Sequence, residues 1–246
     1  MINLKSYSAK THHGPHLEIN EDDVFVDLIN KLYLVFDGFG GAGVGDKMVQ
    51  KIKDSMKLFY TRASRDPNST MPFYFSNKYL LEGNALINSL HFAHSVVNKE
   101  NLEREMSNRG GSSVIAVAQS ESLLTVVSTG NCLGLLYSGG TLDVLINPDS
   151  LQFLSDDHFT GQYSTMPLSG IGLFQDLHLN CREIKVSPGD QVLLLTDGVY
   201  SRIAYKELRH IFGIKEKSLG EKIDELFTMA NHRGNMDNQT SLFLQF

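Results

Sequence analysis

Two aspartates stand where an apolar run ends, and a glycine follows each of them. The run LYLVF leads directly into Asp37 and Gly38, and the run VLLLT leads into Asp197 and Gly198. A third aspartate, Asp237, stands shortly before the apolar run SLFLQF. A strand end holds a carboxylate in a defined position, and a glycine lets the backbone approach a ligand closely. The pattern predicts a site built from carboxylates at the ends of buried strands.

A further acidic group, Glu21 to Asp23, precedes the run VFVDLI. Carboxylates from several strands are costly to gather unless cations lie among them, and Mg²⁺ and Mn²⁺ take such oxygen ligands. Two such ions about 3.5–4 Å apart activate a water and neutralise a phosphoryl oxygen. Aspartate and glycine also favour turns, so one Asp-Gly pair alone indicates little. The set as a whole predicts a metal-dependent phosphohydrolase.

The glycines from Gly38 to Gly43 offer an alternative, because they match G-x-G-x-x-G between a predicted strand and a predicted helix. That is the local context of a dinucleotide-binding loop. However, Asp37 would place negative charge beside a pyrophosphate, and the helix leads into TRASRDPNSTMP rather than into a second strand ending in an acidic residue. The metal site is the favoured interpretation.

Short apolar runs joined by turn residues predict an α+β fold with mainly antiparallel pairing. Asn30 and Lys31 are expected to form a tight hairpin. Two sheets covered by helices would bury so many apolar strands, and no domain boundary is evident in residues 1–246. The predicted strands are Val24–Ile29, Leu32–Phe36, Ser113–Gln119, Leu123–Ser128, Leu133–Tyr137, Thr141–Ile146, Cys181–Val186, Gln191–Thr196 and Ser241–Phe246.

Apolar residues at a spacing of three to four predict four helices between these strands. The first extends from about Val44 to Phe59 and the second from about Tyr79 to Met106. The last two cover Tyr205–Phe212 and the segment from Leu219 to Ala230. Two segments rich in turn residues, Thr61–Asn77 and Asn147–Asp176, are predicted to be loops that shape access to the site.

Composition excludes several classes of function. Lys and Arg number 22 against 28 Asp and Glu, and the formal charge of −6 argues against a nucleic-acid or anionic-membrane partner. No apolar run reaches the roughly 18–20 residues of a membrane span. The start of the chain lacks the apolar core of a signal peptide, and Cys132 and Cys181 lack metal-ligand spacing. A cytoplasmic location is expected, with secretion without a cleaved signal left open.

Five short motifs, in order along the chain, resemble those of the metal-dependent protein phosphatase 2C (PPM) family, in particular its bacterial-type single-domain members. They cover nearly the whole chain. They are NEDD at Asn20–Asp23, VFDGFGG at Val35–Gly41, GGSSVIAVAQ at Gly110–Gln119, SPGDQVLLLTDGV at Ser187–Val199 and DNQTSLFL at Asp237–Leu244.

The resemblance implies a site with two Mn²⁺ or Mg²⁺ ions. Asp37 would bridge the two ions, and the Gly38 carbonyl with Glu21 would complete one of them. Asp197 and Asp237 would complete the other. The nucleophile would be the water between the ions, and the substrate would be phosphoserine or phosphothreonine in a protein, as expected of a signalling phosphatase.

The resemblance also implies a four-layer α-β-β-α sandwich, with the site at one end of two mainly antiparallel sheets. The whole chain, residues 1–246, would form a single catalytic domain. Asp22 would hold a metal-bound water without touching the metal, and Asn238 would steady Asp237.

The sequence departs from the family pattern at several positions. The family's phosphate-binding arginine corresponds to Leu17, and the neighbouring His16 is the candidate to replace it. A histidine that often follows the first Asp-Gly is Phe39 here. Asn131 and Ser201 occupy positions where acidic ligands of a third metal are expected, so a third metal site is predicted to be absent or weak.

Three functions remain open from the sequence. The first is an active two-metal serine/threonine phosphatase, which retention of the two-metal ligands favours. The second is an inactive pseudophosphatase that acts as a regulatory binding module, which the changes at Leu17, Asn131 and Ser201 favour. The third is a phosphatase for a non-protein phosphate ester, which the altered phosphate contact favours. The substrate and the oligomeric state are not readable from the sequence.

Overall fold

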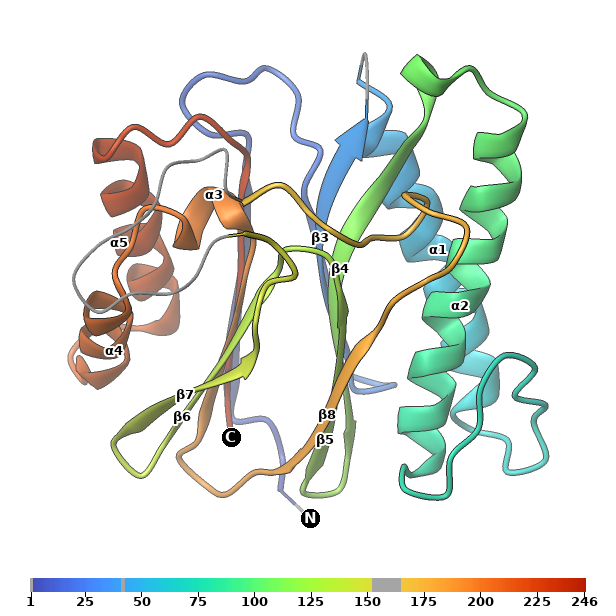
Figure 1. Cartoon of the computed structure of the whole chain (residues 1–246). Coiled ribbons are helices and arrows are strands. Elements are labelled where there is room, and N and C mark those ends of the chain that lie inside the picture. The colour runs from blue at the N-terminus through green and yellow to red at the C-terminus, as the bar shows by residue number, and fades with distance from the viewer. Residues whose placement is uncertain (1, 41–42, 152–164) are drawn as a thin grey trace.

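The computed structural model of the chain describes residues 2–40, 43–151 and 165–246. Two five-stranded sheets lie face to face, and helices cover the outer face of each (Figure 1). One sheet has the order β1-β10-β9-β6-β7 and the other the order β2-β3-β4-β5-β8. Every recorded pairing is antiparallel. The predicted α+β sandwich of four layers is confirmed.

The first sheet consists of β1 (Ser6–His12), β10 (Gln239–Gln245), β9 (Gln191–Leu195), β6 (Leu133–Ser138) and β7 (Thr141–Ile146). The second consists of β2 (Asp23–Asp27), β3 (Leu32–Gly40), β4 (Gly110–Ser120), β5 (Leu123–Thr129) and β8 (Asn180–Lys185). The helices are α1 (Gly45–Ala63), α2 (Leu81–Leu102), α3 (Asp197–Tyr200), α4 (Tyr205–Gly213) and α5 (Leu219–His232), with a short 3₁₀ turn at Met106–Asn108. In Figure 1, α1 and α2 cover the second sheet, and α3, α4 and α5 cover the first.

Alternation along β4 shows how the sheets form the core. Val114 and Ala116 face α1 and α2, whereas Ile115 and Val117 face the other sheet. Successive side chains of a strand point to opposite faces, so a strand covered on both faces is apolar at every position. This explains why the central strands read as continuous apolar runs.

The amphipathic pattern of α1 places Met48, Ile52, Met56 and Tyr60 in the core against the second sheet. These residues recur at a spacing of four and form one face of the helix. The helix continues to Ala63, so the predicted loop Thr61–Asn77 begins three residues later than expected.

The predicted two-residue hairpin at Asn30 and Lys31 is wrong. Asp27 pairs with Leu32, so four residues connect β2 to β3. The Asp27 carboxylate accepts hydrogen bonds from the backbone nitrogens of Ile29 at 3.0 Å and Asn30 at 2.9 Å. An aspartate that binds the turn following it favours a longer connection than a two-residue turn.

Two elements were not predicted from the sequence. β1 has the mixed sequence SYSAKTH and is an edge strand, paired only with β10. α3 has four residues and begins at Asp197, directly after β9. The Gly38–Gly43 segment does not open a parallel βαβ unit, since β3 pairs antiparallel with both neighbours, and its residues 41–42 lie outside the described part of the chain.

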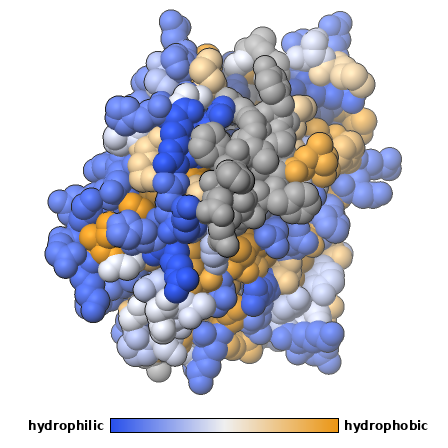
Figure 2. All heavy atoms as spheres, turned by 60° about the vertical axis from the view of Figure 1, so that its left-hand side comes forward, coloured by the Kyte–Doolittle hydropathy of each residue, from blue (hydrophilic) through white to orange (hydrophobic). Residues whose placement is uncertain are grey.

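The loop predicted at Asn147–Asp176 is described for 147–151 and 165–176 only, and residues 152–164 lie outside the description. Its described parts contain no α-helix or strand and one isolated bridge, between Ser112 and Ile171. No helix in the described ranges is long and apolar enough to cross a bilayer. The face in Figure 2, turned toward the α3–α5 side, is mostly hydrophilic with scattered hydrophobic areas.

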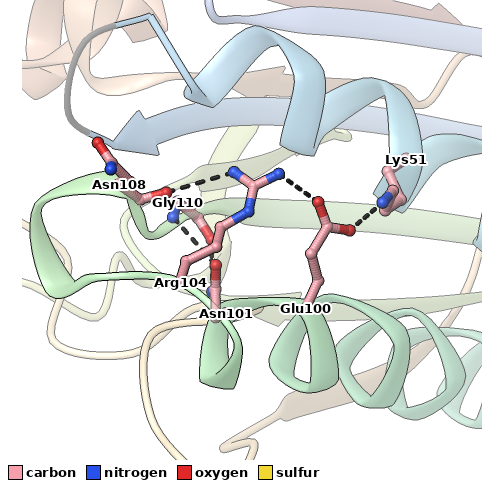
Figure 3. A network of polar contacts seen from close by, with 6 residues as sticks. All are labelled: Lys51, Glu100, Asn101, Arg104, Asn108 and Gly110. Carbon is pink, nitrogen blue, oxygen red and sulfur yellow. Dashed lines mark hydrogen bonds and ion pairs between the residues drawn. The ribbon is translucent and has the colours of Figure 1, made fainter.

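A polar network attaches the end of α2 to α1 and to the start of β4 (Figure 3). Glu100 forms ion pairs with Lys51 and Arg104. The buried Asn101 side chain accepts a hydrogen bond from the Gly110 nitrogen at 3.3 Å and donates to the Gly110 carbonyl at 2.8 Å. Gly110 pairs with Gly40 across β3 and β4, so the network holds the strand that carries Asp37.

Replacing Asn101 should test this attachment. The Asn101→Ala variant leaves buried backbone groups of Gly110 without partners, so we expect a loss of about 2 kcal/mol in the free energy of unfolding. Urea denaturation followed by circular dichroism measures it. Asn98→Ala is the matched control, because Asn98 on the same helix makes one long bond of 3.5 Å at an exposed position. Equal stability of the two variants would contradict the role given to Asn101.

Candidate metal centre

The predicted carboxylates lie close together because, in an antiparallel sheet, the end of one strand lies beside the start of its neighbour. Asp23, at the start of β2, pairs with Phe36, directly before Asp37. Leu195, at the end of β9, pairs with Ser241 on β10. The acidic residues next to these pairs therefore gather at one end of the two sheets, the end at which α3 lies (Figure 1).

A cavity of about 710 Å³ opens at this end of the sheets. Its carboxylates are those of Asp37, Asp197 and Asp237. The other lining residues are Gly38, Phe39, Asn131, Thr165, Met166, Pro167, Arg202 and Met236. Apart from Glu21, all the predicted metal ligands line this cavity. Glu21 lines a different cavity, together with Asp22, Asp23 and Asp46.

The carboxylates of the site are poorly solvated and repel one another. Burial raises the pKa of Asp37 well above its ordinary value, and the neighbouring charge of Asp197 raises it further. Burial and the charge of Asp237 raise the pKa of Asp197 in the same way. The pKa of Asp22 is also raised well above its ordinary value, first by burial and then by Asp197 and Asp237. Such a group of anions favours a nearby cation.

Asp22 links the two sheets. The Thr196 hydroxyl at the end of β9 donates to the Asp22 carboxylate over 2.8 Å, and the same hydroxyl accepts from the Thr240 nitrogen at 2.9 Å. Asp22 is 7% exposed. The bond from Thr196 fixes the direction of the buried carboxylate, which is compatible with the predicted role of Asp22 in holding a water beside the metals.

Asn238 connects Asp237 to Glu21. Its side-chain oxygen accepts from the Glu21 nitrogen at 2.8 Å, and its side-chain nitrogen donates to the carbonyls of His13 and Ile19, both at 3.0 Å. The Asp237 carboxylate accepts the backbone N–H of Asn238 at 2.9 Å. The side chain of Asn238 therefore holds the N-terminal segment and Glu21, while its backbone holds Asp237.

Glu21 lies at the start of α1, where the Gly45 nitrogen donates to its carboxylate over 3.2 Å. A helix start attracts negative charge because its backbone N–H groups point toward it. Burial nevertheless raises the pKa of Glu21, and the charges of Asp46 and Asp237 raise it further. Glu21 belongs electrostatically to the same group of carboxylates.

Two glycines are required by close packing of backbones. A Cβ at Gly38 would lie 2.3 Å from the Glu21 carbonyl oxygen, and one at Gly198 would lie 1.8 Å from the Asn238 carbonyl oxygen. The segment of each Asp-Gly pair thus packs directly on another ligand-bearing segment. This explains the glycine in each pair better than turn formation does.

These donors fit hard divalent ions in chemistry and position. One carboxylate oxygen of Asp37, Oδ2, is buried and has no hydrogen-bond partner among the described residues. Carboxylate and carbonyl oxygens are the ligands that Mg²⁺ and Mn²⁺ take. Within the described ranges, no three His, Cys, Asp or Glu side chains converge in a geometry that could hold one ion. The fit thus rests on the type, burial and mutual repulsion of the donors rather than on a formed coordination shell.

Asn131, at a position where the resemblance predicts an acidic residue, lines the same cavity as the carboxylates. Its side-chain nitrogen donates to Asp197 at 3.1 Å and to the Thr165 carbonyl at 2.9 Å. An ionised aspartate at this position has no hydrogen to donate to Asp197. Ser201, the other replacement, is 1% exposed at the end of α3. The amide thus binds a carboxylate where a further carboxylate would repel it.

His16 is exposed and does not line the cavity, so its predicted contact with phosphate stays a prediction. Leu17 is 40% exposed and also lies outside the lining. Arg202, which sequence reasoning missed, does line the cavity. Its position five residues after Asp197 was the available signal, since it lies close in sequence to a predicted ligand.

Known proteins resemble this chain in sequence and in fold. No family model matches the sequence. The serine/threonine phosphatase stp of Listeria welshimeri is 25% identical over 255 residues, covering 96% of this chain and 94% of the relative. PppA, a regulatory component of the type VI secretion system in Pseudomonas aeruginosa, has a TM-score of 0.78 at 23% identity, with 98% of each chain covered.

The catalytic domain of the serine/threonine protein phosphatase PstP, solved with two manganese ions, has a TM-score of 0.74 at 18% identity. The comparison covers 98% of this chain and 97% of that chain. These two comparisons show that the chain shares the fold of PppA and PstP, with stacked antiparallel sheets between two helical layers. In sequence, the chain resembles the bacterial serine/threonine phosphatase stp over nearly its whole length.

Substitution of Gly38 should test the packing of the site. The Gly38→Ala variant places a Cβ against the Glu21 carbonyl, so we expect a loss of about 1–3 kcal/mol of stability and weaker Mn²⁺ binding. Denaturation and calorimetric titration with Mn²⁺ measure the two effects. Gly220→Ala is the control, because a Cβ there has no neighbour closer than 3.5 Å. Unchanged Mn²⁺ affinity in Gly38→Ala would argue against this packing.

Removal of one carboxylate should separate repulsion from metal binding. The Asp37→Asn variant loses a buried charge that its neighbours repel, so we expect the metal-free variant to melt at the wild-type temperature or above it. Saturating Mn²⁺ should raise the melting temperature of the wild type and not that of the variant. Differential scanning calorimetry with and without EDTA makes the comparison. An equal Mn²⁺ shift in both proteins would remove Asp37 from the metal site.

Proposed function

We propose that the chain is a metal-dependent phosphatase that hydrolyses phosphoserine and phosphothreonine in proteins. The observation that carries the proposal is the group of carboxylates of Asp37, Asp197 and Asp237 around one cavity, where Asp197 is buried and the charge of Asp237 raises the pKa of the other two. The likeness to stp of Listeria welshimeri supports the substrate class, and the two manganese ions of PstP support a two-metal site. Residues 1–246 form one catalytic domain in this proposal, located in the cytoplasm.

Each ligand has a defined part in the proposed mechanism. Asp37, Glu21, the Gly38 carbonyl, Asp197 and Asp237 would hold the two ions, with Asp37 as the ligand that both would share. Divalent ions at this site would supply an activated water and would neutralise charge on the phosphoryl group. Water attack breaks the bond between phosphorus and the serine or threonine oxygen, and inorganic phosphate and the free hydroxyl are the products.

The supporting residues keep this arrangement rigid. Thr196 directs Asp22, whose carboxylate orients a water from outside the metal ligands. The Asn238 side chain positions Glu21 by accepting a hydrogen bond from the backbone nitrogen of Glu21. Such outer contacts fix ligand geometry and commonly affect metal affinity and activity by about 10–100-fold. In this proposal, rigidity comes from hydrogen bonds between segments far apart in the sequence.

We also propose that a third metal site is absent or weak. Asn131 donates its amide to Asp197 and thereby occupies a position where a carboxylate would attract another cation. The same substitution favours the alternative of a regulatory pseudophosphatase. The other alternative is an active phosphatase for a non-protein phosphate ester. Such an enzyme would differ from a protein phosphatase in the substrates that it hydrolyses and not in the metals that it binds.

Mn²⁺-dependent phosphate release from phosphoserine and phosphothreonine peptides and from p-nitrophenyl phosphate tests the proposal. Asp37→Asn should lower kcat by roughly a thousandfold or more, because it removes the shared ligand. Asp224→Asn, a matched change in an exposed ion pair with Lys10, should leave activity unchanged. Absence of wild-type activity with either Mg²⁺ or Mn²⁺ from pH 6 to 9 would favour the pseudophosphatase, and hydrolysis of small esters alone would favour the non-protein substrate.

A further inference from the structure

Arg202 is the one cationic side chain among the described residues that line the carboxylate cavity. Three of the lining side chains are carboxylates, and the remainder, Arg202 apart, are uncharged. A phosphate monoester carries up to two negative charges near neutral pH, so the carboxylates repel it wherever metal ions do not screen them. The guanidinium of Arg202 in the same cavity attracts the negative phosphate group that the neighbouring carboxylates repel.

The backbone of Arg202 is held firmly. The Arg233 guanidinium donates to the Arg202 carbonyl at 2.8 Å and forms two bonds with Glu207, at 2.7 and 2.6 Å. The flanking residues Ser201 and Ile203 are 1% and 2% exposed. These contacts fix the main chain, so the direction in which the Arg202 side chain leaves it is set by the fold.

α3 places Arg202 at a fixed separation from a predicted metal ligand. The helix begins at Asp197, and the Ser201 nitrogen donates to the Asp197 carbonyl at 2.9 Å. The Tyr200 hydroxyl donates to the Asn131 carbonyl at 2.5 Å, which fixes the helix against the loop after β5. Arg202 therefore lies on a short rigid connection that starts at the ligand itself. Such support is what a group that contacts a reacting phosphate needs.

We propose that the guanidinium of Arg202 binds the phosphoryl oxygens of the substrate beside the metal ions. The inference rests on the proposed phosphatase function and extends it by naming the residue that holds the phosphate. Guanidinium suits this role because its planar, permanently charged fork donates two parallel hydrogen bonds to a phosphate. In the described part of the chain, neither His16 nor Leu17 lines the cavity, so neither competes for this position.

Arg202→Met and Arg202→Lys test the proposal with two readouts. The first is calorimetric titration of inorganic phosphate into Mg²⁺-saturated protein. Arg202→Met should weaken phosphate binding by roughly tenfold or more, since it removes a charge-assisted pair, and Arg202→Lys should have an intermediate effect because it keeps the charge and loses the fork. The second readout is hydrolysis of p-nitrophenyl phosphate, in which Arg202→Met should raise KM by a similar factor.

Two controls separate this effect from a structural one. Arg209→Met makes the same change at an exposed position of α4 outside the cavity, and it should bind phosphate as the wild type does. Titration with Mg²⁺ should give equal metal affinity for the wild type and Arg202→Met. Loss of metal binding in Arg202→Met would overturn the proposal, because the residue would then support the ligands rather than the substrate.

The role of Arg202 and the proposed phosphatase function can fail separately, and the remaining outcomes show which of the two has failed. A wild-type protein that hydrolyses no ester but binds phosphate in an Arg202-dependent way would refute the function and support the inference. An active enzyme whose phosphate affinity and KM are unchanged in Arg202→Met would support the function and overturn the inference. Wild-type protein that binds no phosphate when saturated with Mg²⁺ would overturn the inference as well.

Discussion

Repulsion among buried carboxylates is the constraint on which the rest of this structure depends. Asp22, Asp37, Asp197 and Asp237 share one end of the two sheets, where burial and the charges of Asp197 and Asp237 raise the pKa of Asp22 and Asp37. A fold tolerates such a group of carboxylates when hydrogen bonds restrain the side chains and when their negative charge serves to bind a cation. The bonds from Thr196, Asn131 and Asn238 are restraints of this kind.

The antiparallel sandwich is suited to gathering these groups. A strand end and the following strand start lie side by side, so residues far apart in sequence meet without a long connecting loop. The bond between Thr196 and Asp22 then connects the two sheets, between residues that are 174 positions apart in the sequence. Gly38 and Gly198 complete the arrangement by letting backbones from different strands touch. The centre is thus formed by main-chain packing as much as by side chains.

Much of the fold could be predicted from the sequence because its central strands are apolar on both faces and its turns are marked by polar residues. The carboxylate group could be predicted because it recurs beside those strands. β1 was missed because SYSAKTH has few apolar residues, and its strand geometry comes from pairing with β10. The hairpin at Asn30 failed since the Asp27 side chain, not a local dipeptide, organises that turn. Arg202 was missed because its importance lies in a cavity formed by distant segments.

The pairing of β1 with β10 has a consequence for how the molecule folds. Thr11 and Thr240, which pair across these strands, are separated by 229 positions and bond through their hydroxyls at 2.7 Å. Closing so long a loop costs conformational entropy before the stabilising contacts between the two strands can form. Such pairings therefore form slowly. Asp237 lies just before β10, and Glu21 lies between β1 and β2. We therefore expect the carboxylate end of the molecule to be completed late in folding, after strands with more local pairing, such as β4 and β5, have assembled.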